Sequence, residues 1–211
     1  MKSNCSFWNS TENNLNRRGF LGGLTAIGGA GLLPARAFAL TLDEARALID
    51  GLVAEINAVI NSGRSEAQML DEFERLFGVY ANTQVIALRV LGADARTASR
   101  GEVNRFTEAF SGYISRKYGR RFREFIGGRV EVDRTREVNT WYEVQTTAHL
   151  QGEDPFRVDF LVKEAGGRNL FFDMIIEGIS VTRVEREEIG SMLDSRGGDL
   201  DAVSRELRNM G

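Results

Sequence analysis

The sequence contains few of the residues that form covalent or metal links within proteins. Its 211 residues include one cysteine, Cys5, and one histidine, His149. A lone cysteine cannot form a disulfide within the chain, and zinc sites generally use several cysteine or histidine ligands. Only two prolines occur, and no linker or internal repeat divides the chain. Its stability is therefore expected to come from a packed core, which a chain of this length can supply.

The sequence also lacks an apolar run long enough to cross a membrane. Its longest one, ending at Leu33, spans about 15 residues and is interrupted by glycines, whereas a membrane span needs ~20. This run follows residues 16–21, with the sequence NRRGFL, and precedes Ala37-Phe38-Ala39. The three parts together favour a twin-arginine-type signal peptide over a membrane anchor. We interpret residues 1–39 as this signal, removed after Ala39, and expect a periplasmic domain over residues 40–211.

No excess of basic residues is present either. Removal of residues 1–39 would leave 23 basic against 29 acidic residues, from 27 and 30 in the whole chain. Cys5 would leave with the signal, and with it any thiol nucleophile. A protein with a net negative charge is a poor match to a phosphate backbone. Nucleic acid is therefore not expected as a partner.

The stretch from Phe156 to Ser180 has the clearest pattern, since apolar residues alternate with polar ones in two runs. Such alternation predicts two strands, each with one apolar face. A three-residue loop, Ala165-Gly166-Gly167, would join them as a hairpin with Glu164 opposite Arg168. In that register Val162 faces Leu170, Phe160 faces Phe172, and Val158 faces Met174.

The remaining patterns predict two more strands, at residues 130–133 and 140–150, and helices on either side of the strands. Four helices are expected before the strands, at residues 41–60, 65–77, 82–91 and 99–118. Two more are expected after them, at residues 182–194 and 199–209. The helix at 82–91 is apolar on nearly every side and is expected to be deeply buried. The fold class is therefore α+β, a four-stranded antiparallel meander sheet covered on one face by N- and C-terminal helices, with an apolar pocket between.

An ordered set of motifs extends over nearly all of residues 40–211. The set comprises Val90-Leu91-Gly92, Arg96-x-Ala98-Ser99, the segment Phe106 to Phe110 with Tyr118, Asp173-x-x-x-Glu177-Gly178-Ile179-Ser180, and Arg186-x-Glu188-Ile189-x-x-x-Leu193. In order and spacing it resembles the MlaC family, also called toluene-tolerance proteins. The sequence departs from the family pattern at Ala95 and Asn169, where tryptophan is usual, and at Glu185, where tyrosine is common.

The resemblance implies a soluble periplasmic carrier that holds a phospholipid by its acyl chains. Such a carrier passes the lipid between an outer-membrane lipoprotein complex and an inner-membrane ABC transporter, and so maintains the lipid asymmetry of the outer membrane. It implies a protein that is not an enzyme and that has no cofactor other than its phospholipid cargo. Some relatives are associated with hopanoids, so another lipid is the alternative cargo.

A lipid carrier requires an apolar cavity, and the aromatic stripe of the fourth helix together with the apolar sheet face would line it. Methionine and phenylalanine adapt well to variable chains. The alternative is that these side chains fill a dry core, as aromatic stripes commonly do. The predicted lipid-binding residues are Leu91, Phe106, Phe110, Tyr113, Tyr142, Val144, Phe156, Val158, Phe160, Phe172 and Met174.

Two other functions are compatible with the sequence. In the hairpin register given above Asp159 faces Asp173, and paired carboxylates can supply an acid or base to an enzyme with a cone-shaped cavity. Closing the preceding hairpin with Thr146 opposite Val158 brings Gln145 beside Asp159. Arg157 is a diagonal neighbour of the pair, which favours an ordinary ion-paired surface. The third possibility is an adaptor with a solid core.

Two polar features have simple interpretations as well. His149 is expected to be a solvated strand residue rather than a base or metal ligand. The basic residues Arg116, Lys117, Arg120, Arg121 and Arg123 form either a solvated face or a contact for anionic head groups or an acidic partner.

Overall fold

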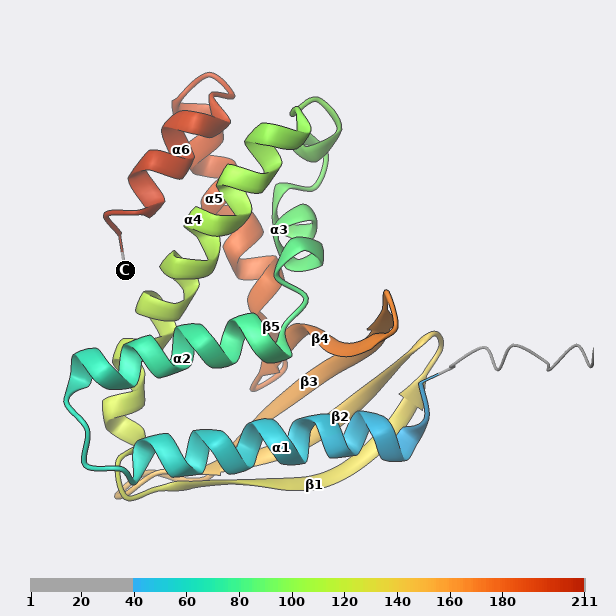
Figure 1. Ribbon diagram of the computed structural model, residues 1–211, viewed down its shortest axis with the longest axis vertical. Coiled ribbons are helices and arrows are strands. Elements are labelled where there is room, and N and C mark those ends of the chain that lie inside the picture. The colour runs from blue at the N-terminus through green and yellow to red at the C-terminus, as the bar shows by residue number, and fades with distance from the viewer. Residues whose placement is uncertain (1–39, 211) are drawn as a thin grey trace, which may run out of the picture. The chain divides into compact units, whose positions relative to one another are not determined.

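The computed structural model describes residues 40–210, except for the side chains of residues 121–123. The predicted signal peptide, residues 1–39, lies outside the described residues. The elements follow in the order α1 (Leu42–Ile60), α2 (Glu66–Tyr80), α3 (Thr83–Leu91), η1 (Asp94–Arg96), α4 (Arg100–Gly119), η2 (Arg120–Phe125), β1 (Arg129–Val138), β2 (Trp141–His149), β3 (Phe156–Ala165), β4 (Arg168–Ile176), β5 (Ile179–Ser180), α5 (Val181–Ser195) and α6 (Leu200–Leu207). Figure 1 shows this arrangement.

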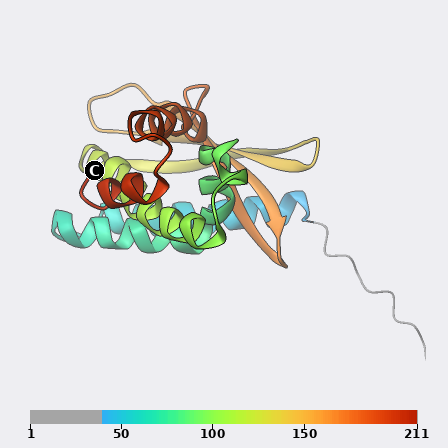
Figure 2. The same cartoon turned by 90° about the horizontal axis from the view of Figure 1, so that it is seen from above.

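The strands form one antiparallel sheet in which spatial order equals sequence order, from β1 to β5. The predicted α+β class and the meander are confirmed, although the sheet has five strands rather than four because a two-residue strand, β5, pairs with the end of β4. Helices α1 and α2 extend across the sheet, and α3, α4, α5 and α6 gather beyond one side of it (Figures 1 and 2). Of the helices within residues 40–210, none combines the length and apolarity that a membrane span requires.

Helices α1, α2 and α4 begin with a capping box. In each box the side chain of the N-cap residue accepts a hydrogen bond from the backbone N–H three residues later, and the side chain of that later residue accepts one from the N-cap N–H. Thr41 pairs with Glu44, Ser65 with Gln68, and Ser99 with Glu102. Thr41 and Ser99, the first residues of two predicted helices, are thus N-caps, and these polar residues fix where α1 and α4 start.

Helix α1 is fastened to the edge strand β1 by polar side chains. Asn57 donates to the Val130 carbonyl (3.0 Å) and accepts from the Val130 amide (2.9 Å), as a neighbouring strand would. Arg46 donates to the Val132 carbonyl (3.2 Å), next to the bulge that the extra residue Asp133 makes in β1. The unpaired edge of the sheet is thereby covered.

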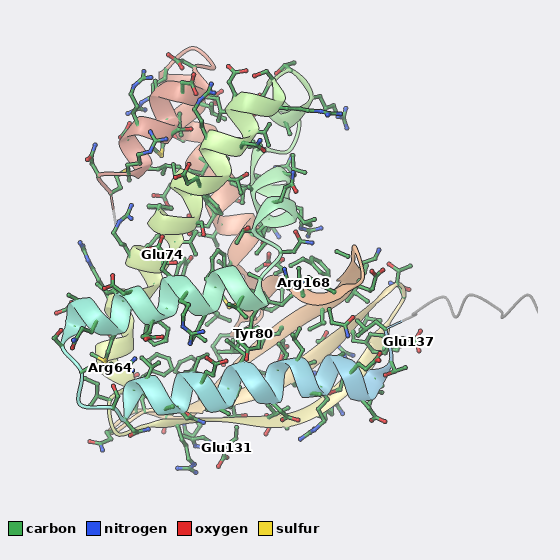
Figure 3. The ribbon with its side chains drawn as sticks, in the orientation of Figure 1. Arg64, Glu74, Tyr80, Glu131, Glu137 and Arg168 are labelled. Carbon is green, nitrogen blue, oxygen red and sulfur yellow. The ribbon has the colours of Figure 1, made fainter. Side chains whose placement is uncertain are left out.

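Helix α2 is held to both α1 and β4. Tyr80, labelled in Figure 3, lies between α2 and α1 and donates a hydrogen bond to Glu55 (2.6 Å). Arg168 on β4 donates to the Val79 carbonyl (3.1 Å). These contacts keep α2 over the sheet and leave the apolar sides of both helices facing it.

Helix α3 is less buried than the sequence predicts. Ile86, Ala87, Val90 and Leu91 are buried, but Val85 and Leu88 are exposed by 36% and 37%. The prediction of a deeply buried helix was wrong because α3 packs mainly against α4 and α5, and no element within residues 40–210 covers Val85 and Leu88.

The hairpin of β3 and β4 also differs from the prediction. Its loop has two residues, Gly166 and Gly167, both with positive φ (60° and 78°), so that Ala165 faces Arg168. A bulge then adds Phe172 to β4, with the result that Phe160 faces Met174. By contrast, the predicted pairing of Thr146 with Val158 between β2 and β3 is confirmed.

Candidate functional site

A cavity of about 340 Å³ lies between the sheet and the helices α1, α2 and α4. We call it the binding cavity. Leu52 and Ile56 of α1 contribute to its walls, as do residues of β2, β3 and β4 that face the helices. The apolar residues that line it are Leu52, Ile56, Phe73, Leu76, Phe77, Ile114, Phe125, Val130, Ala148, Leu150, Phe156, Val158, Phe160, Phe171, Met174 and Ile176. Its volume lies in the range of about 300–1,000 Å³ typical of small-molecule sites.

The mouth of the binding cavity is marked by those lining residues that solvent reaches. These are Glu124 of η2, Glu153 of the β2–β3 loop and Glu177 after β4, all exposed. Phe125 and Phe156 meet edge to face just inside, with ring centroids 5.9 Å apart. The cavity therefore has an apolar interior and a polar, mostly acidic rim.

At its other end the binding cavity adjoins a small space of about 10 Å³, which we call the inner chamber. Four side chains line both spaces and separate them, namely Phe77, Ile114, Phe171 and Met174. Beyond them the inner chamber is also bounded by Phe110, Asp173, Thr182 and Glu185. The apolar cavity thus ends near two buried carboxylates.

Glu185, which is fully buried, belongs to a polar cluster between α4 and α5. Its Oε1 accepts from Lys117 (2.9 Å) and from Tyr118 (2.7 Å), and Tyr118 itself lines the binding cavity. Lys117 also donates to Glu188 (2.5 Å) and to Tyr113 (2.8 Å). Glu185 Oε2, in contrast, has no hydrogen-bond partner among the described residues.

The charge states of this cluster follow from its contacts. Burial opposes the charge of Lys117, but hydrogen bonds to Glu188, Tyr113 and Glu185 outweigh it and raise the pKa of Lys117. Burial likewise opposes the charge of Glu188, yet hydrogen bonds from Lys117 and Tyr113 outweigh it and lower the pKa of Glu188. Burial raises the pKa values of Tyr113 and Tyr118. Lys117 and Glu188 are therefore ionised and both tyrosines neutral at ordinary pH.

A larger depression, of about 710 Å³, lies on the outer face of α5. All of its walls come from that one helix, and they are Arg183, Arg186, Glu187, Gly190, Ser191 and Asp194. A single polar helix face cannot enclose an apolar ligand, so the smaller binding cavity is the better candidate site.

Comparison with protein families identifies the chain. The family model described as "MlaC protein" matches residues 49–209. The chain belongs to the MlaC family. The match covers α2 to α6 and most of α1, and therefore every element that lines the binding cavity.

Among solved structures, this MlaC protein is similar to a phospholipid-binding protein from Ralstonia solanacearum, determined in complex with a phospholipid. The two share 18% identity with a TM-score of 0.66, over 77% of this chain and 98% of the other. At this identity the likeness shows a shared fold. A comparison with curated proteins finds no match.

The structure places four of the predicted lipid-binding residues in the wall of the binding cavity, namely Phe156, Val158, Phe160 and Met174. Phe110 lines the inner chamber instead. The core residues Leu91, Phe106, Tyr113 and Val144 are buried outside the cavity lining, and Tyr142 packs against the core. Whether a lipid contacts the cavity-lining residues stays a prediction.

Phe172 lies apart from the cavity because of the bulge in β4. Its ring packs edge-on against Trp141 (6.0 Å) and lies under the Arg89 guanidinium (5.2 Å). Phe171 takes the cavity position and packs against Phe160 (5.4 Å). Phe171 is not among the predicted lipid-binding residues, and the signal for it in the sequence is the adjacent pair Phe171 and Phe172, which interrupts the alternation of apolar and polar residues.

The helix residues that line the cavity were also absent from the predicted site. Leu52, Ile56, Phe73, Leu76 and Phe77 reach the cavity from α1 and α2. Their helical spacing assigns them to the inward faces of the two helices. Spacing alone does not distinguish a cavity wall from a solid core.

The predicted carboxylate pair is wrong in its geometry. Asp159 faces Ile175, and Asp173 faces Leu161, because the loop is shorter and the bulge shifts the register. Asp159 is paired with the Arg157 guanidinium (2.6 and 2.7 Å). Asp173 accepts hydrogen bonds from the Thr182 and Ser180 hydroxyls (both 2.7 Å). Each carboxylate thus has a structural role of its own.

The basic segment at residues 116–123 is not a uniform solvated face. Arg116 donates to the carbonyls of Leu207 (2.7 Å) and Met210 (2.8 Å) and so caps α6. Lys117 belongs to the buried cluster, and only Arg120 among the described side chains of this segment is exposed. Arg116 and Lys117 therefore have structural roles within the domain.

His149 is a strand residue, as predicted, with its side chain 25% exposed and its Nε2 3.1 Å from Glu131 Oε2. Within residues 40–210 no group of three acidic, histidine or cysteine side chains could hold a metal ion.

Proposed function

We propose that this MlaC protein is a periplasmic carrier that binds a phospholipid by its acyl chains. In this proposal it shuttles the lipid between an outer-membrane complex and an inner-membrane ABC transporter complex, and so maintains the lipid asymmetry of the outer membrane. It has no catalytic role and no cofactor besides its cargo. The observation that carries the proposal is the apolar binding cavity with an exposed polar rim in a protein of the MlaC family.

The energetics of lipid transfer explain why such a cavity is needed. An acyl chain exposed to water costs about 0.8 kcal/mol per methylene, or on the order of 10 kcal/mol for a chain of ~16 carbons. The binding cavity offers phenylalanine, leucine, isoleucine and methionine side chains in place of water. The exposed glutamates at its mouth would leave the head group in contact with solvent.

The same geometry weakens the other two hypotheses. An enzyme based on Asp159 and Asp173 would need the two carboxylates to act together, and the register separates them. An adaptor would need a solid core, and the cavity interrupts the core between the sheet and α2. A carrier requires the cavity and does not require the two carboxylates to act together.

The direct test is native mass spectrometry of the protein purified from its own periplasm, followed by extraction and identification of lipids. We expect about one phospholipid per chain, bound in the apolar cavity between the sheet and the helices. A hopanoid in its place would keep the carrier function and change the cargo. A folded protein without lipid, although membranes were available to it, would contradict the proposal.

Two variants should connect the bound lipid to the cavity. Val158→Asp places a charge in the wall, and Ala148→Phe fills the space with apolar atoms and so preserves folding. We expect both to copurify with at least about tenfold less lipid, because a buried charge or a blocked space costs more than ~1.4 kcal/mol. Lys163→Asp, at an exposed site on the same strand, is the matched control and should retain lipid. Equal lipid in all three folded variants would exclude this cavity as the site.

A further inference from the structure

The inner chamber, at the end of the apolar binding cavity, is lined in part by the carboxylate of Glu185. Glu185 is fully buried, and both hydrogen bonds to its carboxylate, from Lys117 and Tyr118, reach Oε1. Its Oε2 has no partner among the residues that the structure describes. A buried acceptor of this kind destabilises the folded protein when it is unpaired. Such an oxygen is therefore prepared to accept a hydrogen bond.

The other polar groups around the chamber do not supply that donor. Asp173 is itself an acceptor and is already bonded by Ser180 and by Thr182, whose hydroxyl and amide both reach Asp173 Oδ1. The remaining walls are apolar side chains, among them Phe77, Ile114 and Phe171. The chamber thus presents an acceptor and no free donor among its described walls.

A ligand in the binding cavity could reach this oxygen. The partition between cavity and chamber consists only of side chains, and one of them is the unbranched, flexible Met174. Tyr118 lines the cavity on one side of the partition and bonds to Glu185 on the other. The chamber, about 10 Å³, has room for about one water-sized group.

We propose that the inner chamber is a subsite for a hydrogen-bond donor carried on the apolar part of the cargo, with Glu185 Oε2 as the acceptor. The chemical class is a lipid with a hydroxyl group on an acyl chain, away from its head group. This inference rests on the proposed lipid-carrier function and refines its specificity. A site built to bond a hydroxyl should discriminate against the analogue that lacks it, since the carboxylate oxygen is then left unpaired.

The test is a competition between lipids that differ only by a hydroxyl. Delipidated protein is mixed with vesicles that contain equal amounts of dipalmitoyl phosphatidylethanolamine and the same lipid hydroxylated on one acyl chain, mid-chain or at its end. Native mass spectrometry then gives the ratio of the two complexes. We expect at least one hydroxylated lipid to be preferred by about tenfold or more, as hydrogen bonds to charged groups permit.

Variants of Glu185 and Glu188 test whether the preference for a hydroxylated lipid depends on Glu185 Oε2. Glu185→Gln keeps the shape and lets the amide oxygen accept from Lys117 and Tyr118, but it presents an N–H₂ donor to the chamber. We expect the preference to disappear in this variant. Glu188→Gln is the matched control, because Glu188 also pairs with Lys117 and Tyr113 but does not line the chamber. It should keep the preference.

The outcomes separate this inference from the proposed function. Equal binding of all the lipids, or preference for the unhydroxylated one, would overturn the subsite while leaving the carrier function intact. Loss of preference in both variants would overturn the role of Glu185 Oε2. Failure to bind either lipid would contradict the proposed phospholipid cargo itself. The wild-type comparison requires no variant, so it remains decisive if Glu185→Gln does not fold.

Discussion

Gly92, which ends α3, has a backbone conformation that only glycine adopts readily. Its φ and ψ are 60° and −114°, and its amide bonds back to the Leu88 carbonyl. The Arg186 guanidinium of α5 lies over its Cα, so that an added Cβ would come within 2.5 Å of Arg186 Nη2. The glycine therefore serves both the end of α3 and the contact between α3 and α5.

We predict that Gly92→Ala lowers the free energy of unfolding by about 1–3 kcal/mol, because alanine at this φ and ψ is strained even if Arg186 moves aside. Gly190→Ala is the control, since Gly190 lies inside α5 and a Cβ there would meet nothing within 4 Å. That change should stabilise the protein by about 0.5–1 kcal/mol. Denaturant unfolding of both variants measures the difference, and equal effects would refute the strain at Gly92.

At the scale of elements, the turn from β4 into α5 depends on one buried carboxylate. Asp173 accepts from the amide and the hydroxyl of Thr182 (3.1 and 2.7 Å) and from its neighbouring amide, Met174 (2.9 Å). It also accepts from Ser180, whose hydroxyl oxygen caps α5 by accepting from Arg183. The turn itself uses positive φ at Glu177 and Gly178. The motif Asp173-x-x-x-Glu177-Gly178-Ile179-Ser180 is thus a structural corner.

We expect Asp173→Ala to lower the free energy of unfolding by about 3 kcal/mol, because it leaves buried amides without an acceptor. The exposed Asp194, near the end of α5, is the control, and Asp194→Ala should change this free energy by less than about 0.5 kcal/mol. Urea unfolding followed by circular dichroism would measure both. A loss below about 1 kcal/mol for Asp173→Ala would show that the corner does not depend on this carboxylate.

The same elements show what the sequence can predict. Helix starts at Thr41 and Ser99 follow from local capping chemistry, and strand faces follow from alternation, as for Val158 and Phe160. The bulge in β4 does not follow, because Phe171 and Phe172 are alike in polarity and the alternation does not show which of them is the extra residue. This extra residue, together with a hairpin loop one residue shorter than predicted, moved Phe172 out of the predicted site and separated Asp159 from Asp173 in the ladder. The sequence therefore predicts the helices, the strands and their layering. The pairing register of β3 with β4 is visible only in the structure.

At the scale of the whole domain, the cavity lies within one continuous core to which both the helices and the sheet contribute. Helices α1 and α2 reach the sheet partly across the cavity, through residues such as Leu52 and Phe73 that line it. Helices α3 to α6 pack on one another and around Phe106 and Tyr113, which are fully buried, and α4 also contributes Ile114 to the cavity wall. A bound acyl chain would add apolar contacts between helices α1 and α2 and the sheet. A bound lipid should consequently raise the free energy of unfolding of the domain.

We predict that removal of the lipid lowers the melting temperature. A ligand present at about 100 times its Kd stabilises the folded state by ~2.7 kcal/mol, which for a domain of this size corresponds to about 5–10 °C. Differential scanning calorimetry of the delipidated protein, before and after addition of phospholipid vesicles, would measure the shift. Ala148→Phe fills part of the cavity and should unfold at the same temperature with and without vesicles. An equal rise in both proteins would mean that the lipid binds elsewhere, and no rise in the wild type would mean that the cavity does not hold it.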